Sequence, residues 1–418
     1  MMVNSSPPPL LSIVIATRNR IPYAISAIQS ILKISDQRLE LVVQDNSESQ
    51  DLELYVNENI KDSRFRYEYI AKPLSMIDNF NAAVELSTGE YICLIGDDDG
   101  VNPEIIEAAA WAKIENLDSL SVRQSSYYLW PGTGLSSTLF TKVTGGSLAV
   151  QPFSGKIFQI DLEKELRALF RNGGLYYLSF NLAKAYHGLV RRQCFELIKD
   201  KTGNYFGGSS PDMFSAIAIS CVAKRAAIIE YPLTIPGHCR IAENTHHVVK
   251  AHLRPFEDAP HFKNRGKYIW CDLVPRIYIG EAFWVDSGIA ALRAMGRDDL
   301  VQELSLPKLA AHCVGGYRGI TKPILRNMFN GLRRTNKSQF IGFIYFIFGM
   351  VSGPGNKFIR RVWNRVLLII SIKSCHQFND VKDMSECSKK LTSYLNDNGY
   401  SFSDCVKQKK LNLKKKAT

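Results

Sequence analysis

Cysteine is scarce in this sequence and never paired. The nine cysteines among 418 residues stand singly, without Cys-x-x-Cys spacing. The absence of paired cysteines argues against a zinc site and, in a reducing compartment, against a disulfide framework. The first nine residues, Met1–Pro9, also lack the basic residue and the apolar core of a signal peptide. We therefore expect the chain to stay in the cytosol.

Two common nucleotide-binding motifs are missing as well. Neither Gly-x-Gly-x-x-Gly nor Gly-x-x-x-x-Gly-Lys-Ser/Thr follows the first predicted strand, so neither a dinucleotide-binding fold nor a P-loop is indicated. No long glycine, serine or glutamine tract indicates disorder, and 45% hydrophobic with 22% charged residues is a globular composition. A chain of 418 residues can form two or three domains.

Acidic residues are absent from one long stretch of the chain. Between Arg318 and Lys373 there are eleven Lys or Arg and no Asp or Glu, in a chain of net charge +12. The apolar runs 340–351 and 366–370 lie inside this stretch, and both are shorter than the roughly 20 residues that span a bilayer. The pattern predicts a segment in contact with an anionic membrane surface. The alternative is a buried core helix with a solvated basic rim.

The net charge of +12 is also compatible with a protein that binds nucleic acid or another polyanion. The aromatic residues, however, are not interleaved with the basic ones in an RNP-like or OB-like pattern. The acidic triplet at residues 97–99 would also repel a phosphate backbone. We therefore expect no nucleic-acid partner.

The central feature of the sequence is an apolar run that ends in three carboxylates. Residues 91–96 are typical of a strand buried on both faces of a sheet, and Asp97, Asp98 and Asp99 follow them directly. Adjacent carboxylates raise one another's pKa, so a divalent cation bound through oxygen would stabilise the ionised triplet. A solvated acidic turn is the alternative. The position favours a ligand site, because open α/β sheets bind ligands beyond the carboxyl ends of their strands.

Two earlier strands also end in polar residues. The apolar runs 10–16 and 39–44 precede Thr17-Arg18-Asn19-Arg20 and Asp45-Asn46-Ser47. Helices are predicted between the strands, over residues 22–33, 51–60 and 75–87. This alternation indicates a largely parallel sheet, with all three strand ends on one edge. There, carboxylates can hold a base or ribose, arginine and backbone N–H groups a diphosphate, and a metal can lie between them.

Five motifs stand in order within about the first 105 residues. They are Ser12–Arg20, Val42–Ser47, Asn79–Ala83, Gly89–Ile92 and Gly96–Asp99. Together they resemble the family 2 glycosyltransferases of the GT-A fold. The resemblance implies a Rossmann-like, open mixed α/β sheet flanked by helices, a nucleotide-sugar donor, a Mg²⁺ or Mn²⁺ ion on a D-x-D motif, and inversion at the anomeric carbon.

The resemblance also implies which residues contact the donor. Thr17 and Arg18 would lie near the nucleotide, Asp45 at the base, and Asp97 at the ribose. Asn81 is either a further donor contact or a helix-packing residue, because asparagine also satisfies local backbone groups.

The resemblance implies that the metal ligands are Asp98, Asp99 and His238. Gly96 stands where the family motif usually has an aspartate, so either Asp98 or Asp99 can be the main ligand. His238 is implied because GT-A enzymes often draw a metal or phosphate contact from this region. A surface or packing histidine is the alternative, since no paired-ligand spacing accompanies it.

Asp212 is the candidate catalytic base. An inverting transfer needs a carboxylate that accepts the proton of the attacking hydroxyl, and related transferases place one about a hundred residues after the D-x-D motif. The alternative is a helix cap, because Asp212 follows Pro211 at the start of an apolar helix over 213–223.

These expectations divide the chain into three regions. Residues 1–245 form the catalytic domain, with a donor half over 1–105 and an acceptor half over 106–245. Residues 246–317 form a helical extension, and residues 318–418 form a basic C-terminal region associated with a membrane.

The expected function is an inverting, metal-dependent hexosyl or N-acetylhexosaminyl transfer. The donor is a nucleotide-diphosphate sugar, with UDP-sugar favoured, and the acceptor is a hydroxyl of a cell-surface glycan or a lipid-linked molecule. The protein would be peripheral on the cytoplasmic face of the membrane. A polyanion-binding protein and a catalytically degenerate transferase scaffold are the alternatives.

Overall fold

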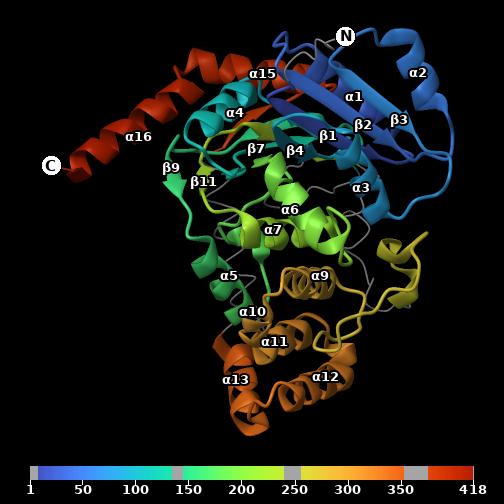
Figure 1. The fold of residues 1–418 in the computed structure, drawn as a ribbon, viewed down its shortest axis with the longest axis vertical. Coiled ribbons are helices and arrows are strands. Elements are labelled where there is room, and N and C mark those ends of the chain that lie inside the picture. Colours follow the sequence, from blue (N-terminus) through green and yellow to red (C-terminus); the bar gives the residue numbers. More distant parts are fainter. Residues whose placement is uncertain (1–7, 134–144, 240–255, 353–374, 418) are drawn as a thin grey trace, which may run out of the picture.

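The computed structural model describes residues 8–133, 145–239, 256–352 and 375–417. Its centre is an eight-stranded sheet (Figure 1). In spatial order the strands are β3 (Phe65–Tyr69), β2 (Leu39–Asp45), β1 (Leu11–Thr17), β4 (Tyr91–Ile95), β10 (Gly188–Arg191), β6 (Ser119–Val122), β11 (Ala226–Ile229) and β9 (Ile157–Gln159).

The sheet is parallel over the donor half and mixed beyond it. Strands β3, β2, β1 and β4 run parallel, with Thr17 opposite Asp45 and Ile15 opposite Ile95. Strand β10 is antiparallel to both β4 and β6, and β9 is antiparallel to β11. The mixed α/β sheet confirms the predicted fold class, and the register brings the ends of β1, β2 and β4 to one edge, as predicted.

Alternating residues of the strands pack into two apolar layers, one on each face of the sheet. Ile13, Val43 and Cys93 face a layer that contains α1 (Ile21–Leu32), α4 (Ile105–Ile114) and α15 (Met384–Asp397). Val14 and Leu94 face the opposite layer, which contains α3 (Met76–Leu86), α6 (Arg192–Thr202) and α7 (Pro211–Val222). All five of these strand residues are buried. Because both faces of the strands are covered, the sequences of the strands are continuously apolar.

The helical region is continuous with the second layer. Below the sheet in Figure 1 lie α5 (Leu162–Arg171), α9 (Gly280–Ala294), α10 (Asp298–Gln302), α11 (Leu306–Gly316), α12 (Thr321–Arg334) and α13 (Gln339–Ser352). Helix α9 packs against α7, and α11 packs against both α12 and α13. Residues of α7, α9 and α11 share one apolar core, so the predicted helical extension is joined to the catalytic domain through a common interior. Its predicted boundary at residues 245 and 246 lies outside the described residues.

The last part of the chain returns to the catalytic domain. Strand β14 (His376–Phe378) pairs with β8 (Ser147–Val150) in a second sheet that also contains β7 (Ser126–Leu129) and β13 (Gly237–His238). Helix α15 lies on α1, and the Met384 N–H donates to the Ser26 hydroxyl at 3.0 Å. From β14 onward the predicted C-terminal region therefore packs on the catalytic domain, and its association with a membrane stays a prediction. The second apolar run, 366–370, lies outside the described residues.

Smaller features complete the fold. Strands β6 and β7 follow each other closely in the chain but belong to different sheets. Gly89 lets the chain pass close to Ser12, whose hydroxyl accepts the Gly89 N–H at 2.7 Å. The C-terminal basic tail is helical in α16 (Phe402–Ala417). Further short elements are α2 (Asp51–Asn59), β5 (Gly100–Val101) and β12 (Thr234–Ile235).

Candidate active site

A cleft of about 1380 Å³ opens at the carboxyl ends of β1 and β4. The donor-half side of the cleft is lined by Arg18, Arg20, Asn46, Asn79 and the three residues Asp97, Asp98 and Asp99. The opposite side is lined by Lys184, Asp212, Glu281, Trp284 and Tyr317. The cleft therefore combines the sheet edge, the start of α7 and the helical region.

The acidic triplet lies at the base of this cleft and is buried. Asp97, Asp98 and Asp99 are 2%, 6% and 3% exposed. The Thr17 hydroxyl donates to Asp97 at 2.7 Å. The guanidinium of Arg20 lies 2.7 Å from Asp97 and 2.9 Å from Asp98. A cation of the chain itself therefore offsets two of the three carboxylates.

Asp99 is held by a different set of donors. Its carboxylate accepts the Gly96 N–H at 2.6 Å and the Gly237 N–H at 2.7 Å. Nε2 of His187 lies 3.1 Å away, and the Tyr186 hydroxyl donates at 3.2 Å. His187 takes the left-handed conformation, with φ of 57°. Asp99 thus ties the end of β4 to β13 and to the segment before β10.

These surroundings separate the pKa values of the three carboxyl groups. Burial raises the pKa of Asp97 to about 7, although the charge of Arg20 acts in the opposite direction. Burial and the neighbouring charge of Asp99 raise the pKa of Asp98. Burial also disfavours the ionised form of Asp99, but the charge and hydrogen bond of His187, with the two backbone N–H groups, bring its pKa below the ordinary value. Asp99 is therefore the carboxylate that stays ionised most readily.

Arg18 lies beside the acidic triplet on the same edge of the sheet. Its guanidinium donates to the Leu74 carbonyl at 3.0 Å and to the side chain of Asn46 at 3.3 Å. Asn46 holds the same loop, because its amide donates to the carbonyls of Ile70 and Lys72 at 2.6 and 2.8 Å. Arg18 therefore offers a positive charge in a loop whose position is fixed.

Two predicted donor contacts lie behind the cleft wall. Asp45 is fully buried and accepts the Ser47 N–H at 2.8 Å and the Tyr67 hydroxyl at 2.9 Å. The side-chain oxygen of Asn81 accepts the N–H groups of Tyr205 and Phe206 at 2.9 and 3.0 Å. Like Thr17, which is buried against Asp97, neither Asp45 nor Asn81 is among the described residues that line the cleft. Both hold loops whose other residues, Asn46 and Phe206, do line it.

Asp212 lies across the cleft from the sheet edge. It is in the first turn of α7, where Pro211 begins the helix. Its carboxylate accepts hydrogen bonds from the hydroxyls of Tyr177 and Ser210. The Asp212 side chain does not cap α7: position N-cap is Ser210, which makes no side-chain capping bond. Burial, and next the charge of Asp212, raise the pKa of Tyr177 well above its ordinary value, so this phenol keeps its proton and donates.

The donor half of the chain matches a known family. Residues 12–128 match the family model described as glycosyl transferase family 2. This segment is similar to the family 2 glycosyltransferases. The match runs from β1 to β7 and contains Thr17, Arg18 and the acidic triplet, and it ends before Asp212 and His238.

Solved structures of glycosyltransferases are similar at low identity. S. aureus TarS 1-349 in complex with UDP-GlcNAc has 14% sequence identity and a TM-score of 0.45, over 79% of this chain and 93% of that chain. The mannosyltransferase PcManGT from Pyrobaculum calidifontis, in complex with GDP-Man and Mn²⁺, has 15% identity and a TM-score of 0.38, over 79% and 87%. A search of curated protein sequences gave no match.

The predicted metal ligands do not converge at the cleft. Among the described residues, no three His, Cys, Asp or Glu side chains are arranged to hold a metal ion. His238 is exposed on β13 at the cleft, and Asp99 is engaged by the donors described above. One oxygen each of Asp97 and Asp98 is buried without an aligned hydrogen bond from any described residue, and Arg20 faces both. Both oxygens lie against the guanidinium of Arg20, so a metal ion held by Asp97 and Asp98 would displace that cation.

Several residues of the site were not singled out from the sequence. Arg20 stands inside the motif Ser12–Arg20 and His187 inside no predicted motif, and only the fold reveals that both pair with the triplet. Tyr177 meets Asp212 through η1 (Tyr177–Ser179), a contact without a sequence pattern. Glu281 and Trp284 come from the helical region, for which the sequence analysis predicted no chemistry.

Proposed function

We propose that the chain transfers a sugar from a nucleotide diphosphate to an acceptor hydroxyl, with inversion at the anomeric carbon. One observation carries the proposal: the acidic triplet after β4 and Asp212 of α7 line the same cleft, in a chain whose donor half is similar to the family 2 glycosyltransferases. Arg18 and a divalent cation at the triplet can hold the nucleotide diphosphate, and Asp212 can accept a proton. An inverting transfer requires both functions in one site.

Arg18 and Asp97 are the proposed donor contacts at the sheet edge, and Thr17 acts through its hydrogen bond to Asp97. The guanidinium of Arg18 suits the diphosphate, because a planar cation can bind phosphate oxygens through two N–H groups. Asp97 suits a ribose hydroxyl, and Thr17 fixes the orientation of its carboxylate. Asp45 and Asn81 act through the loops that they hold, so their predicted contacts with the donor become indirect in this proposal.

A Mg²⁺ or Mn²⁺ ion would be held by Asp98 together with Asp97, at the two buried oxygens that Arg20 pairs with before an ion binds. When bound, the ion would offset the negative charge of the departing nucleotide diphosphate. The chain supplies further positive charge with Arg18, Arg20 and Lys184. Burial lowers the pKa of Lys184 to about 8, so it carries a proton at neutral pH.

Asp212 is the proposed base. Tyr177 and Ser210 donate to its two oxygens and so orient the carboxylate toward the cleft. As the acceptor oxygen forms its bond to the anomeric carbon, its proton passes to Asp212 and the bond between that carbon and the diphosphate breaks. The attack comes from the face opposite the leaving group, which inverts the configuration.

The acceptor would be a hydroxyl of a cell-surface glycan or a lipid-linked sugar. Trp284 and Tyr317 line the side of the cleft that holds Asp212, and aromatic rings suit the apolar faces of sugar rings. The ring of Trp284 packs edge-on against Tyr177, with 5.2 Å between ring centroids. The donor would be a hexose or N-acetylhexosamine on a nucleotide diphosphate, with UDP-sugars the first to test.

The test is a transfer assay with a panel of nucleotide sugars, in which release of the nucleotide diphosphate is measured. Asp212→Asn should lower the rate by about 10² to 10⁴ fold, as expected for loss of a general base. Asp200→Asn is the matched control, because Asp200 is exposed at the end of α6. Wild-type activity in Asp212→Asn, or a product of retained configuration, would overturn the proposed mechanism.

A further inference from the structure

Helix α13 carries a broad apolar surface that is exposed. Its exposed residues are Phe340, Ile341, Phe343, Ile344, Tyr345, Ile347, Phe348 and Val351, and Phe340 is 75% exposed. In a helix, residues 341, 344 and 348 lie on the side opposite residue 346. A soluble helix normally places charged residues on such an outward face, and between Phe340 and Val351 α13 has none.

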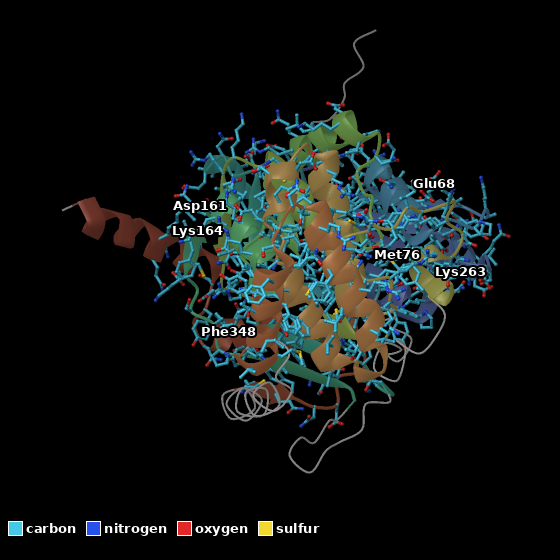
Figure 2. The ribbon with its side chains drawn as sticks, turned by 90° about the horizontal axis from the view of Figure 1, so that it is seen from below. Glu68, Met76, Asp161, Lys164, Lys263 and Phe348 are labelled. Carbon is cyan, nitrogen blue, oxygen red and sulfur yellow. The ribbon has the colours of Figure 1, made fainter. Side chains whose placement is uncertain are left out.

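The other side of α13 is packed against the protein. Phe346 is buried, and Gly342 and Gly349 share its side of the helix. A side chain at Gly342 would overlap Leu332 of α12, and a Cβ at Gly349 would lie 3.0 Å from Ala311 of α11. Helix α13 thus packs tightly against α11 and α12 along one side, and the residues on its other sides are exposed. Figure 2 views this end of the molecule, with α12 and α13 in orange in front.

A basic stripe on α12 lies next to the apolar face. Lys322, Arg326 and Arg333 are exposed, and their spacing places them on one side of the helix together with Phe329. The ring of Phe329 stacks on Phe343 of α13, with 6.2 Å between ring centroids. The stripe and the apolar face therefore form one continuous surface, which we name the α12–α13 surface.

The charges of this surface are all of one sign. The sequence from Arg318 to Lys373 contains no acidic residue. Arg334 pairs with Asp272, at 2.5 Å, and the Lys337 ammonium donates to the Gln302 carbonyl. By contrast, Lys322, Arg326 and Arg333 form no ion pair with any residue that the structure describes. These three side chains can therefore bind an external anion.

We propose that the α12–α13 surface docks on an anionic lipid bilayer. Helix α13 lies in the plane of the interface with its apolar face among the acyl chains, and Lys322, Arg326 and Arg333 contact the lipid phosphates. The 14 residues of α13 measure about 21 Å, less than the about 30 Å of a hydrocarbon core. Within the described ranges, no helix has the length and apolar character needed to cross a membrane. The helix therefore lies on the bilayer rather than across it.

A second copy of the chain fits this surface less well. A two-fold dimer would bring the same patch of both copies together, so the basic stripes would approach each other without acidic partners. An anionic bilayer matches both halves of the surface at once: its phosphates suit the stripe and its acyl chains suit α13.

The test is sedimentation of the full chain with lipid vesicles. We expect binding to vesicles that contain phosphatidylglycerol, weaker binding to phosphatidylcholine alone, and weakening with added salt. Phe340→Ser/Ile344→Ser should lower the affinity about tenfold or more, because both apolar contacts are lost. Arg326→Gln/Arg333→Gln should lower it about fivefold for each arginine. Ile114→Ser is the matched control, because Ile114 is an 81% exposed isoleucine on α4.

Other occupants give different results in the same experiments. Unchanged vesicle binding in the Phe340→Ser/Ile344→Ser variant, or no binding by the folded wild type, would overturn the proposal. A dimer that dissociates in that variant, without vesicle binding, would assign the surface to a second copy instead. Nucleotide-sugar turnover without vesicles is measured in parallel, so failure of the membrane proposal is distinguished from failure of the proposed transfer.

Discussion

The guanidinium of Arg20 lies 2.7 Å from a carboxylate oxygen of Asp97 and reaches Asp98 as well. Arg20 follows β1 and the two aspartates follow β4, so the pair joins two strand ends at the base of the cleft. Burial opposes the charge on Arg20, but the charges of Asp97 and Asp98 raise its pKa above the ordinary value. Arg20 therefore stays charged and stabilises the triplet before any donor or metal binds.

Replacement of Arg20 by methionine tests this role. Arg20→Met removes the charge but keeps a long side chain, so Asp97 and Asp98 lose their counter-ion in a buried site. We expect the free energy of unfolding to fall by roughly 3 kcal/mol at pH 8, as measured by urea denaturation. Adding Asp97→Asn should restore part of the loss.

Arg276→Met is the control for that substitution. Arg276 and Glu257 form an exposed ion pair at 2.6 Å, so its loss should change the free energy of unfolding by less than about 1 kcal/mol. Equal stability of Arg20→Met and the wild type would contradict the role given to Arg20.

The raised pKa of Asp97 predicts a pH dependence of stability. With a pKa of about 7 in the folded state and an ordinary value near 4 when unfolded, the folded chain binds more protons between these pH values. The free energy of unfolding should therefore fall as pH rises from 5 to 7, by up to about 1.4 kcal/mol per pH unit from this group.

Asp97→Asn should lack most of this slope when urea denaturation is repeated between pH 5 and 7. The lowered pKa of Asp99 acts in the opposite sense, but its contribution is lost only as the pH falls below about 4. Parallel stability profiles of the wild type and Asp97→Asn would show that Asp97 does not titrate in this range.

Tyr177→Phe removes one of the two hydroxyls that orient Asp212. We expect kcat to fall about tenfold, the effect of losing one hydrogen bond to a charged group, while KM for the donor stays the same, because Tyr177 touches the base rather than the sheet edge. Tyr55→Phe on α2 is the control, since its hydroxyl bonds only to the exposed Gln29 amide. A change in KM alone would place Tyr177 in donor binding instead.

Gly237→Ala tests the close passage of β13 past the acidic triplet. A Cβ at this position would overlap the Asp98 carbonyl and lie 2.9 Å from the Trp130 indole nitrogen. The strand must shift, so its N–H would leave Asp99. We expect a loss of about 2 kcal/mol in the free energy of unfolding and weaker donor binding. At Gly266 a Cβ would meet nothing within 4 Å, and Gly266→Ala should leave both properties unchanged.

The sequence predicted the donor half well because local patterns determine it. The buried strands β1, β2 and β4 are continuous apolar runs, and the polar residues that follow them meet at one edge through the parallel register. This reasoning located Arg18 and Asp97 without any knowledge of long-range contacts.

Long-range contacts explain what the sequence did not predict. His187 reaches Asp99 through a left-handed turn before an antiparallel strand, and Tyr177 meets Asp212 although 35 residues separate them. The return of α15 to α1 depends on Met384, whose side chain occupies the space beside Gly100. No periodicity within either segment encodes such pairings.

The central claim, that the sheet edge binds a nucleotide diphosphate, is tested most directly by calorimetry. A panel of nucleotide diphosphates is titrated into the wild type and into Asp97→Asn/Asp98→Asn, with and without Mn²⁺, with the fold of both checked by circular dichroism. We predict that the wild type binds one nucleotide, more tightly with Mn²⁺, and that the variant binds it at least about tenfold more weakly. If the folded wild type binds no nucleotide, or the variant binds equally well, the transferase account is contradicted.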